Sequence, residues 1–428
     1  MLDINFIREN KKIVADNLKK RKTNIDLEKF LLLDNDRREL IREIEELRKQ
    51  KNEISSKGPN TVDVNKAKEI KQKLNNLEPK LKDIEQELQK QLLLFPNISD
   101  PEVPEGESEA DNKVIREWGS PRKFDFPIKD HAEIGKKLDI IDIERGVKIS
   151  GSGFYYLKNE GALLEMALIN FAINKLRNKG FTFLITPDLV KERSMIGTGF
   201  FPTEENEIYK MDKDDLYLVG TSEVALVSYH SDEILEDEKL PLFYTGFSSC
   251  FRREAGSYGK DSKGLFRVHQ FNKVEMVVLS KPEQSEEIHQ KLVKISEEIL
   301  QELKLPYQVV INCLGDLGVP NKKRYDINTW MPSWNNYRET HSASNDGDFQ
   351  SRRLNIRYRN NKGEVNFCHT LNNTAVASPR LLVALIENYQ NQDGSVTVPE
   401  ILHPYVSFKE IRITNYAEEE IKKIPRKK

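Results

Sequence analysis

Hydrophobic positions repeat at helical spacing in the first fifth of the chain and form two long stripes. The first stripe contains Ile44 and four residues spaced seven apart: Leu33, Leu40, Leu47 and Ile54. The second alternates steps of three and four without a break: Ala67, Ile70, Leu74, Leu77, Leu81, Ile84 and Leu88. This spacing is typical of a coiled-coil seam. Because Gly58-Pro59-Asn60 separates the stripes, the pattern predicts an antiparallel helical hairpin with arms of about 30 residues and roughly 45 Å.

A proline inside the second helix and the charge of both arms bear on the predicted hairpin. Pro79 lies inside the second helix, where its missing N–H should kink the helix or cost about 3 kcal/mol. Residues 37–57 and 65–95 each carry seven basic and five acidic side chains, so both arms are slightly positive. Charge of this kind is typical of a solvated coiled-coil surface, and the alternative is a surface that contacts a polyanion. Charge alone favours the solvated surface.

The chain changes character after residue 95. Residues 96–106 are rich in proline and acid and have no periodicity, which predicts a linker. We therefore expect an N-terminal domain at 1–95, a linker at 96–118 and a larger domain at 119–428. In the larger domain a helical segment at 162–176 is mixed irregularly with β-rich runs: 181–185, 271–279 and 354–358. This order favours an α+β fold on an antiparallel sheet with flanking helices over a doubly wound fold.

Composition excludes several classes of protein. The 428 residues are 38% hydrophobic and 32% charged, and no apolar run approaches the roughly 20 residues that span a bilayer. No basic stretch followed by an apolar one starts the chain, so we expect a cytoplasmic protein without a membrane partner. The chain has 67 basic and 69 acidic residues, so it has no overall positive charge, and it could bind a polyanion only through local clusters of basic residues. The three cysteines and seven histidines have no zinc-ligand spacing, so we expect no zinc.

A nucleotide-binding loop is sought first among the glycines. The best candidate, Gly256-Ser257-Tyr258-Gly259-Lys260-Asp261, fails as a P-loop because its glycine spacing is short. Asp261 also stands where a Ser or Thr hydroxyl would bind magnesium. A nucleotide would therefore be held by side chains.

Side chains suited to a nucleotide lie in three segments. Arg252 and Glu254 are two residues apart, which places them on one face of a strand, and an arginine fork suits a phosphate. Alternation then puts a mostly polar set on one side of the next strand: Arg267, His269, Phe271, Lys273 and Glu275. The second segment is 339–342, where Glu339 and Ser342 offer hard oxygens of the kind magnesium accepts. The third is 369–380, which ends at Arg380 before a helix.

The order of these segments resembles the three motifs of class II aminoacyl-tRNA synthetases. Motif 1 corresponds to Pro187, motif 2 to Phe251-Arg252-Arg253-Glu254 and motif 3 to Arg380. Further segments are similar to the seryl-tRNA synthetase family: Gly197-Thr198-Gly199-Phe200, Thr221-Ser222-Glu223, Glu254-Ala255-Gly256, Phe266-Arg267-Val268-His269-Gln270-Phe271, Asp348-Phe349-Gln350-Ser351-Arg352-Arg353 and Thr370-Leu371-Asn372-Asn373-Thr374. With the hairpin and the Pro96-Asn97 junction, the resemblance extends over nearly the whole chain.

The resemblance implies a carbon–oxygen ligase with ATP as substrate and Mg²⁺ as cofactor. Such an enzyme forms seryl-adenylate from L-serine and ATP and passes the seryl group to serine tRNA, and to selenocysteine tRNA where present. A homodimer formed around Pro187 is also implied. Within the site, Arg252 would hold the α-phosphate, Glu254 would orient the nucleotide, and Phe271 and Arg380 would sandwich adenine.

The implied site residues fall into five groups. The catalytic set is Arg252, Glu254 and Arg380. The ATP-binding set is Arg252, Glu254, Phe271, Glu339, Thr340, His341, Ser342 and Arg380, with Glu339 and Ser342 as the magnesium ligands. The serine-binding set is Thr221, Ser222, Glu223, Glu275 and Thr374. The tRNA-binding set on the hairpin is Arg42, Lys49 and Lys73.

Some positions depart from this family, and two other classes of protein are weighed against it. His341 and Ala343 stand where many relatives carry Ser and Cys, and Gly220 where many carry Pro. The cysteine-bearing zinc site of one branch is missing, so we expect the zinc-free type. A related ligase that loads a carrier protein would lack residues 33–94. A non-catalytic coiled-coil protein would keep the hairpin but would not need the catalytic arginines and acids together.

Overall fold

The computed structural model describes residues 1–56, 64–255 and 264–413. The chain divides into two compact units, Met1–Ile98 and Ser99–Lys428. The turn expected at 58–60 and the glycine segment 256–261 lie outside the described residues.

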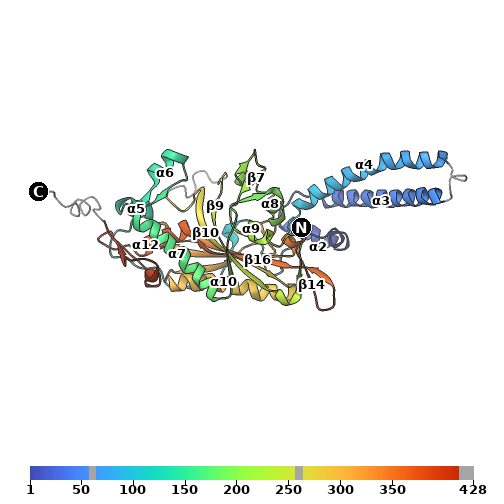
Figure 1. Cartoon of the computed structure of the whole chain (residues 1–428). Helices are drawn as coiled ribbons and strands as arrows, with labels where there is room; N and C mark the ends of the chain where they lie inside the picture. Colours follow the sequence, from blue (N-terminus) through green and yellow to red (C-terminus); the bar gives the residue numbers. More distant parts are fainter. Residues whose placement is uncertain (57–63, 256–263, 414–428) are drawn as a thin grey trace. The chain divides into compact units, whose positions relative to one another are not determined.

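The first unit contains the predicted helical hairpin. Its helices are α1 (Ile4–Glu9), α2 (Lys11–Lys20), α3 (Leu27–Ser56) and α4 (Val64–Leu94). Figure 1 shows α3 and α4 side by side, and residues of both predicted stripes form one apolar cluster: Ile44, Leu47, Ile54, Ile70 and Leu74. The two stripes thus pack as a coiled-coil seam. The second helix, α4, runs through Pro79 as a single element.

A separate cluster closes the base of the hairpin. Phe30 of α3 packs on Phe95, just after α4, with ring centroids 4.8 Å apart. Asp34 is also buried here, and its carboxylate lies 3.0 Å from Arg8 and 2.9 Å from Arg37. A buried carboxylate is tolerated when cations and hydrogen bonds compensate its lost hydration. These contacts tie α1 to the base of α3.

The second unit is built on an eight-stranded sheet within the described residues. In spatial order the strands are β1 (Lys113–Trp118), β11 (Tyr307–Ile311), β12 (Lys323–Met331), β13 (Asn336–Gly347), β16 (His369–Ala377), β10 (Gln270–Ser280), β9 (Leu242–Phe251) and β4 (Thr182–Ile185). Only β4 runs parallel to its neighbour, and the other pairs are antiparallel. The expected α+β class on an antiparallel sheet is confirmed.

Alternation along β10 separates the two faces of this sheet. Val274, Met276 and Val278 belong to the main apolar core, to which three long helices contribute: α7 (Asn159–Asn178), α10 (Ser285–Glu302) and α12 (Ser378–Asn388). Val277 and Leu279 point to the other face, into a smaller core with α9 (Glu223–Ser228) and the end of α11 (Phe349–Leu354). The polar residues earlier in β10 share this second face, which is where an open cavity is found.

Several segments can be compared directly with the sequence pattern. The helix expected at 162–176 lies within α7, and the strands expected at 181–185 and 271–279 match β4 and β10. The strand expected at 354–358 is correct only at its end, because Leu354 is the last residue of α11 and the strand β14 spans Arg357–Arg359. Residues 113–118, assigned to the linker, form the edge strand β1. Across the described ranges, every helix is too short or too polar to cross a bilayer.

Candidate active site

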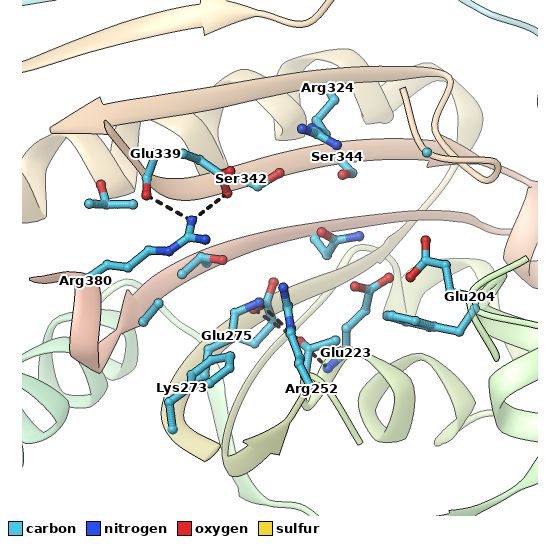
Figure 2. A pocket seen from close by; sticks show the side chains of 18 of the residues that line it. Glu204, Glu223, Arg252, Lys273, Glu275, Arg324, Glu339, Ser342, Ser344 and Arg380 are labelled. Atoms are coloured by element: carbon cyan, nitrogen blue, oxygen red, sulfur yellow. Dashed lines mark hydrogen bonds and ion pairs between the residues drawn. The ribbon is translucent and has the colours of Figure 1, made fainter. Parts of the chain in front are cut away.

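A cavity of about 330 Å³ opens on the second face of the sheet. Its walls come from β10, β13 and β16, from the start of α9 and α12, and from the segment that follows β9 (Figure 2). Most of the site residues expected in this unit line it: Thr221, Glu223, Arg252, Glu254, Phe271, Glu275, Glu339, Thr340, Ser342, Thr374 and Arg380. The fold thus brings together side chains that are up to 159 positions apart in the sequence, from Thr221 to Arg380.

Two β-bulges bring polar side chains of β13 and β16 into the cavity. In β13, His341 pairs with Ile327 and Glu339 with Asn328, so Thr340 is an extra residue. Glu339 and Ser342 are three positions apart and would otherwise point to opposite faces, but the bulge lets both line the cavity. A second bulge in β16 falls between Thr374 and Val376 and leaves Thr374 and Ala377 on the cavity side.

One end of the cavity combines hydroxyl, carboxylate and ammonium groups. Lys273 forms an ion pair with Glu275 and donates a 3.3 Å hydrogen bond to the Thr221 hydroxyl. Gln350 donates to Glu223 at 2.9 Å and fixes that carboxylate from behind. Glu275 is nearly fully buried, at 1% exposure. These contacts hold two acids and one hydroxyl in a fixed arrangement.

Burial changes the protonation of the acids at this end. Burial, and then the carboxylates of Asp346 and Glu275, raise the pKa of Glu223 to about 8. Burial also raises the pKa of Glu275, although the ammonium of Lys273 opposes the shift. A cationic ligand would reverse part of these shifts, because it stabilises the ionised carboxylates.

The other end of the cavity is rich in arginine. The Arg252 guanidinium lies 5.5 Å from the centroid of the Phe271 ring, and its Nε donates to the Gly220 carbonyl at 3.3 Å. In Figure 2, Arg380 reaches toward Glu339, and the ion pair between them measures 3.2 Å. Enclosure in the cavity would raise the pKa of Glu339, but the Arg380, Arg324 and Arg252 guanidinium groups outweigh it and lower that pKa. This end is suited to a polyanion.

Glu254 reaches the cavity by a route that the alternation argument missed. The strand expected to carry both Arg252 and Glu254 ends at Phe251, so that expectation is wrong. Glu254 instead has a left-handed backbone (φ +51°), and its carboxylate lies 3.0 Å from the Arg267 guanidinium. Arg252 and Glu254 both line the cavity, although both come after the end of the strand.

Three residues singled out from the sequence lie away from the described cavity wall. The Ser222 hydroxyl is buried and donates to the Gly246 carbonyl at 3.2 Å. His341 is buried between the Thr340 hydroxyl at 2.8 Å and the Ala375 carbonyl at 3.2 Å, and burial lowers its pKa to about 3. The His269 ring lies 2.9 Å from the Arg252 carbonyl. Ser222 and His341 thus stand behind residues that do line the cavity.

Some residues that line the cavity were not assigned a role in the site from the sequence. They are Phe266, Arg267, Lys273, Asn321, Arg324, Ser344 and Asn372. Strand alternation had placed Arg267 and Lys273 beside Phe271 and Glu275, so a signal for these two existed. Phe266 and Asn372 lie in two of the segments that resemble the family. The other three are Arg324 in β12, Ser344 in β13 beyond the bulge and Asn321 in the segment before β12, and no local pattern links them to the cavity.

The basic residues expected to bind tRNA lie in the first unit. Arg42 and Lys49 on α3 and Lys73 on α4 are all exposed. The apolar seam occupies the opposite positions of the same helices, so these side chains face solvent.

Comparisons with known proteins agree with this architecture. Residues 1–99 match the seryl-tRNA synthetase N-terminal domain, and residues 205–389 match the tRNA synthetase class II core domain (G, H, P, S and T). A serine–tRNA ligase of Dictyoglomus turgidum is 44% identical over 424 residues, which is 96% of this chain and 99% of the relative. One from Borrelia garinii is 45% identical over 426 residues, covering 97% and 100% of the two chains.

Solved structures give the same result. The seryl-tRNA synthetase of Pyrococcus horikoshii complexed with ATP superposes with a TM-score of 0.91 and 41% identity, over 97% of this chain and 100% of that one. The cytoplasmic enzyme of Naegleria fowleri in complex with AMP gives 0.87 and 33%, over 97% and 99%. The chain therefore belongs to the seryl-tRNA synthetase family.

Proposed function

We propose that this chain activates L-serine with ATP and transfers the seryl group to serine tRNA, and to selenocysteine tRNA where that is present. The observation that carries the proposal is the division of one cavity into an arginine-rich end and an end with acids and hydroxyls. A triphosphate suits the first end, and a small amino acid with an ammonium and a hydroxyl suits the second. The relatives named as serine–tRNA ligases support the same activity.

The first step joins the two substrates. A serine carboxylate oxygen attacks the α-phosphorus of ATP, the bond to the β-phosphate breaks, and pyrophosphate leaves. Arg252 holds the α-phosphate while negative charge develops on it, and its contacts with Phe271 and the Gly220 carbonyl fix its position beforehand. Phe271 and Arg380 sandwich adenine, and Glu254 orients the nucleotide.

Glu339 and Ser342 are proposed as the magnesium ligands. Their oxygens fit this ion because the bulge in β13 turns both into the cavity, and because the surrounding guanidinium groups keep Glu339 ionised. Bound there together with the phosphates of ATP, Mg²⁺ would neutralise part of their charge. We expect no zinc in this chain.

Thr221, Glu223, Glu275 and Thr374 form the proposed serine pocket. An ammonium group is accepted by the carboxylates, and the serine hydroxyl takes part in the hydrogen bonding around Thr221 and Glu275. An amino acid without that hydroxyl would leave buried polar groups unpaired, which is costly.

The second step needs a tRNA acceptor. A hydroxyl of the terminal adenosine attacks the seryl carbonyl, and AMP leaves. Arg42, Lys49 and Lys73 on the hairpin are proposed to contact tRNA phosphates. In this proposal residues 1–95 serve as a tRNA-binding domain and residues 119–428 as the catalytic domain.

A homodimer is proposed as the working form. Three apolar side chains are exposed: Leu163 at 53% and Met166 at 47% on α7, and Ile185 at 78% at the end of β4, two residues before Pro187. A second copy of the chain would cover them. Sedimentation velocity should give about twice the monomer mass, and a monomer at micromolar concentration would refute this part.

Pyrophosphate exchange tests the proposed activity. Exchange of labelled pyrophosphate into ATP is measured with each of the twenty amino acids in turn, with and without magnesium. We expect strong, magnesium-dependent exchange with serine alone. Exchange with another amino acid, or with none, would contradict the proposal.

A further inference from the structure

A buried network on the far side of Phe266 connects α12 with the segment before β10. Glu387 of α12 is fully buried, and its carboxylate accepts hydrogen bonds from Ser333 and from His131, which begins α5 (His131–Lys137). The Nδ1 atom of the His131 ring lies 2.8 Å from Glu387. Neither His131 nor Glu387 is among the described residues that line the cavity.

The hydrogen bonds determine the tautomer of His131. The backbone N–H of Leu265 donates to Nε2 of the ring at 3.0 Å, so Nε2 carries no hydrogen. The ring hydrogen is therefore on Nδ1, which donates it to Glu387. A carboxylate in this place orients the ring and keeps Nε2 free to accept, as it does behind many working histidines.

The backbone passes so close to His131 that the contact is specific. A Cβ on Gly264 would lie 1.9 Å from Nε2, and Gly264 has a φ of +80°. Only glycine meets both conditions. The segment 264–266 is therefore held directly against the imidazole ring.

This contact reaches the cavity through one aromatic residue. Phe266 follows Leu265, lines the cavity and lies 5.0 Å beneath the Arg380 guanidinium. Trp334 joins the two ends of the network, since it stacks on His131 at 5.8 Å and packs against Phe266 at 5.3 Å. Phe266 thus forms a platform for Arg380, a residue that the proposed function assigns to ATP.

We infer that His131 is a positioning residue for ATP, which acts through the Leu265 N–H and the Phe266 ring on Arg380. The inference rests on the proposed function only for the role of Arg380. It follows that loss of the Nε2 acceptor should weaken ATP binding and leave the serine pocket unchanged, because Thr221, Glu223 and Glu275 make no contact with this network in the described structure.

Two substitutions of His131 separate its hydrogen bonds. His131→Asn keeps a donor near Glu387 but removes the acceptor for Leu265. His131→Gln keeps an acceptor at the distance of Nε2 and loses the ring donor. Phe266→Leu removes the platform and leaves the network intact. Glu133→Gln, on the exposed side of the same helix, is the matched control.

The measurement is the KM of ATP and of serine in the exchange reaction. We expect His131→Asn and Phe266→Leu to raise the KM of ATP about tenfold, His131→Gln to raise it less than about threefold, and the KM of serine to stay within about twofold throughout. An unchanged ATP KM in folded His131→Asn, equal rises for both substrates, or His131→Gln no better than His131→Asn would overturn the inference.

Calorimetric binding of ATP to the full chain separates this result from failure of the proposed function. If the wild-type chain binds ATP but exchanges with no amino acid, the proposed function fails while the inference is still tested by the affinities. If His131→Asn binds ATP as tightly as the wild type, the inference fails whatever the exchange assay shows.

Discussion

Beyond the buried Asp34 at the base of the α3–α4 hairpin, most charged side chains point to solvent and the apolar seam holds the helices together. Arg48 and Glu78 form an ion pair across the hairpin, but both are largely exposed, at 61% and 44%. In the cavity of the second unit the arrangement is reversed. There the Lys273–Glu275 pair is at most 9% exposed, and it rests on hydrogen bonds to neighbouring groups.

This difference governs how each region should respond to change. An exposed charge remains hydrated, so its loss alters stability little and weakens a distributed interface only gradually. A buried charge that loses its partner keeps its full desolvation cost. We therefore expect single substitutions to act strongly in the cavity and weakly on the hairpin.

The largest expected effect concerns selection of serine over alanine by the cavity. Alanine would leave the buried polar groups of the pocket unpaired. We therefore expect kcat/KM for pyrophosphate exchange to be about ten-thousandfold lower with alanine than with serine. The measurement is exchange with serine-free alanine as the substrate. Comparable rates for the two amino acids would show that Thr221, Glu223, Glu275 and Thr374 do not form the pocket.

The next largest effect is expected for Arg252→Ala. Removal of one fixed donor from the developing charge should reduce exchange by a factor on the order of a hundred to a thousand, with an unchanged circular dichroism spectrum. Arg193→Ala is the control, since Arg193 forms an exposed ion pair with Asp232 and should leave exchange unaltered. A loss of only a few-fold in Arg252→Ala would remove this arginine from the mechanism.

Protonation of Glu223 should give a smaller effect on stability. Its pKa of about 8 lies above the pKa of a glutamate in the unfolded chain. Between these two pKa values the folded chain therefore binds more protons than the unfolded chain. The free energy of unfolding should therefore fall as pH rises from about 5 to 8, and less so in Glu223→Gln. Urea denaturation across this range measures it, and identical pH profiles would contradict the shift.

The smallest effects are expected on the hairpin. Arg42→Ala, Lys49→Ala or Lys73→Ala should each weaken tRNA binding only a few-fold and lower the salt dependence by about one unit of slope for each phosphate that is no longer neutralised. Exchange should not change. Glu43→Gln, an exposed acid on α3 beside Arg42, is the matched control. A loss of exchange in any of the three would refute the separation between the regions.

The sequence predicted these two regions unequally well, for physical reasons. The hairpin depends on a local period, so Leu47 and Leu74 could be placed in the seam directly. In the cavity, alternation placed Phe271, Lys273 and Glu275 correctly because β10 is regular. The bulges in β13 and β16 depend on pairing between distant strands, and local spacing does not encode them.

The same limit explains the residues that did not reach the cavity. His341 was assigned to ATP with its neighbours, but the extra residue Thr340 turns it into the protein interior. Ser222 lies between two cavity residues and bonds to β9 instead. Family resemblance located the correct segments, and the orientation of each side chain within them required the tertiary structure.

The central claim is that the hairpin serves tRNA while the cavity alone forms the adenylate. Replacement of residues 33–94 by a short Gly-Ser linker tests it, with exchange and tRNA charging measured on the same preparation. The account predicts exchange near the full rate and a collapse of charging that modest increases in tRNA do not restore. Equal loss of both activities in a folded protein would contradict the claim and show that the hairpin supports the catalytic unit itself.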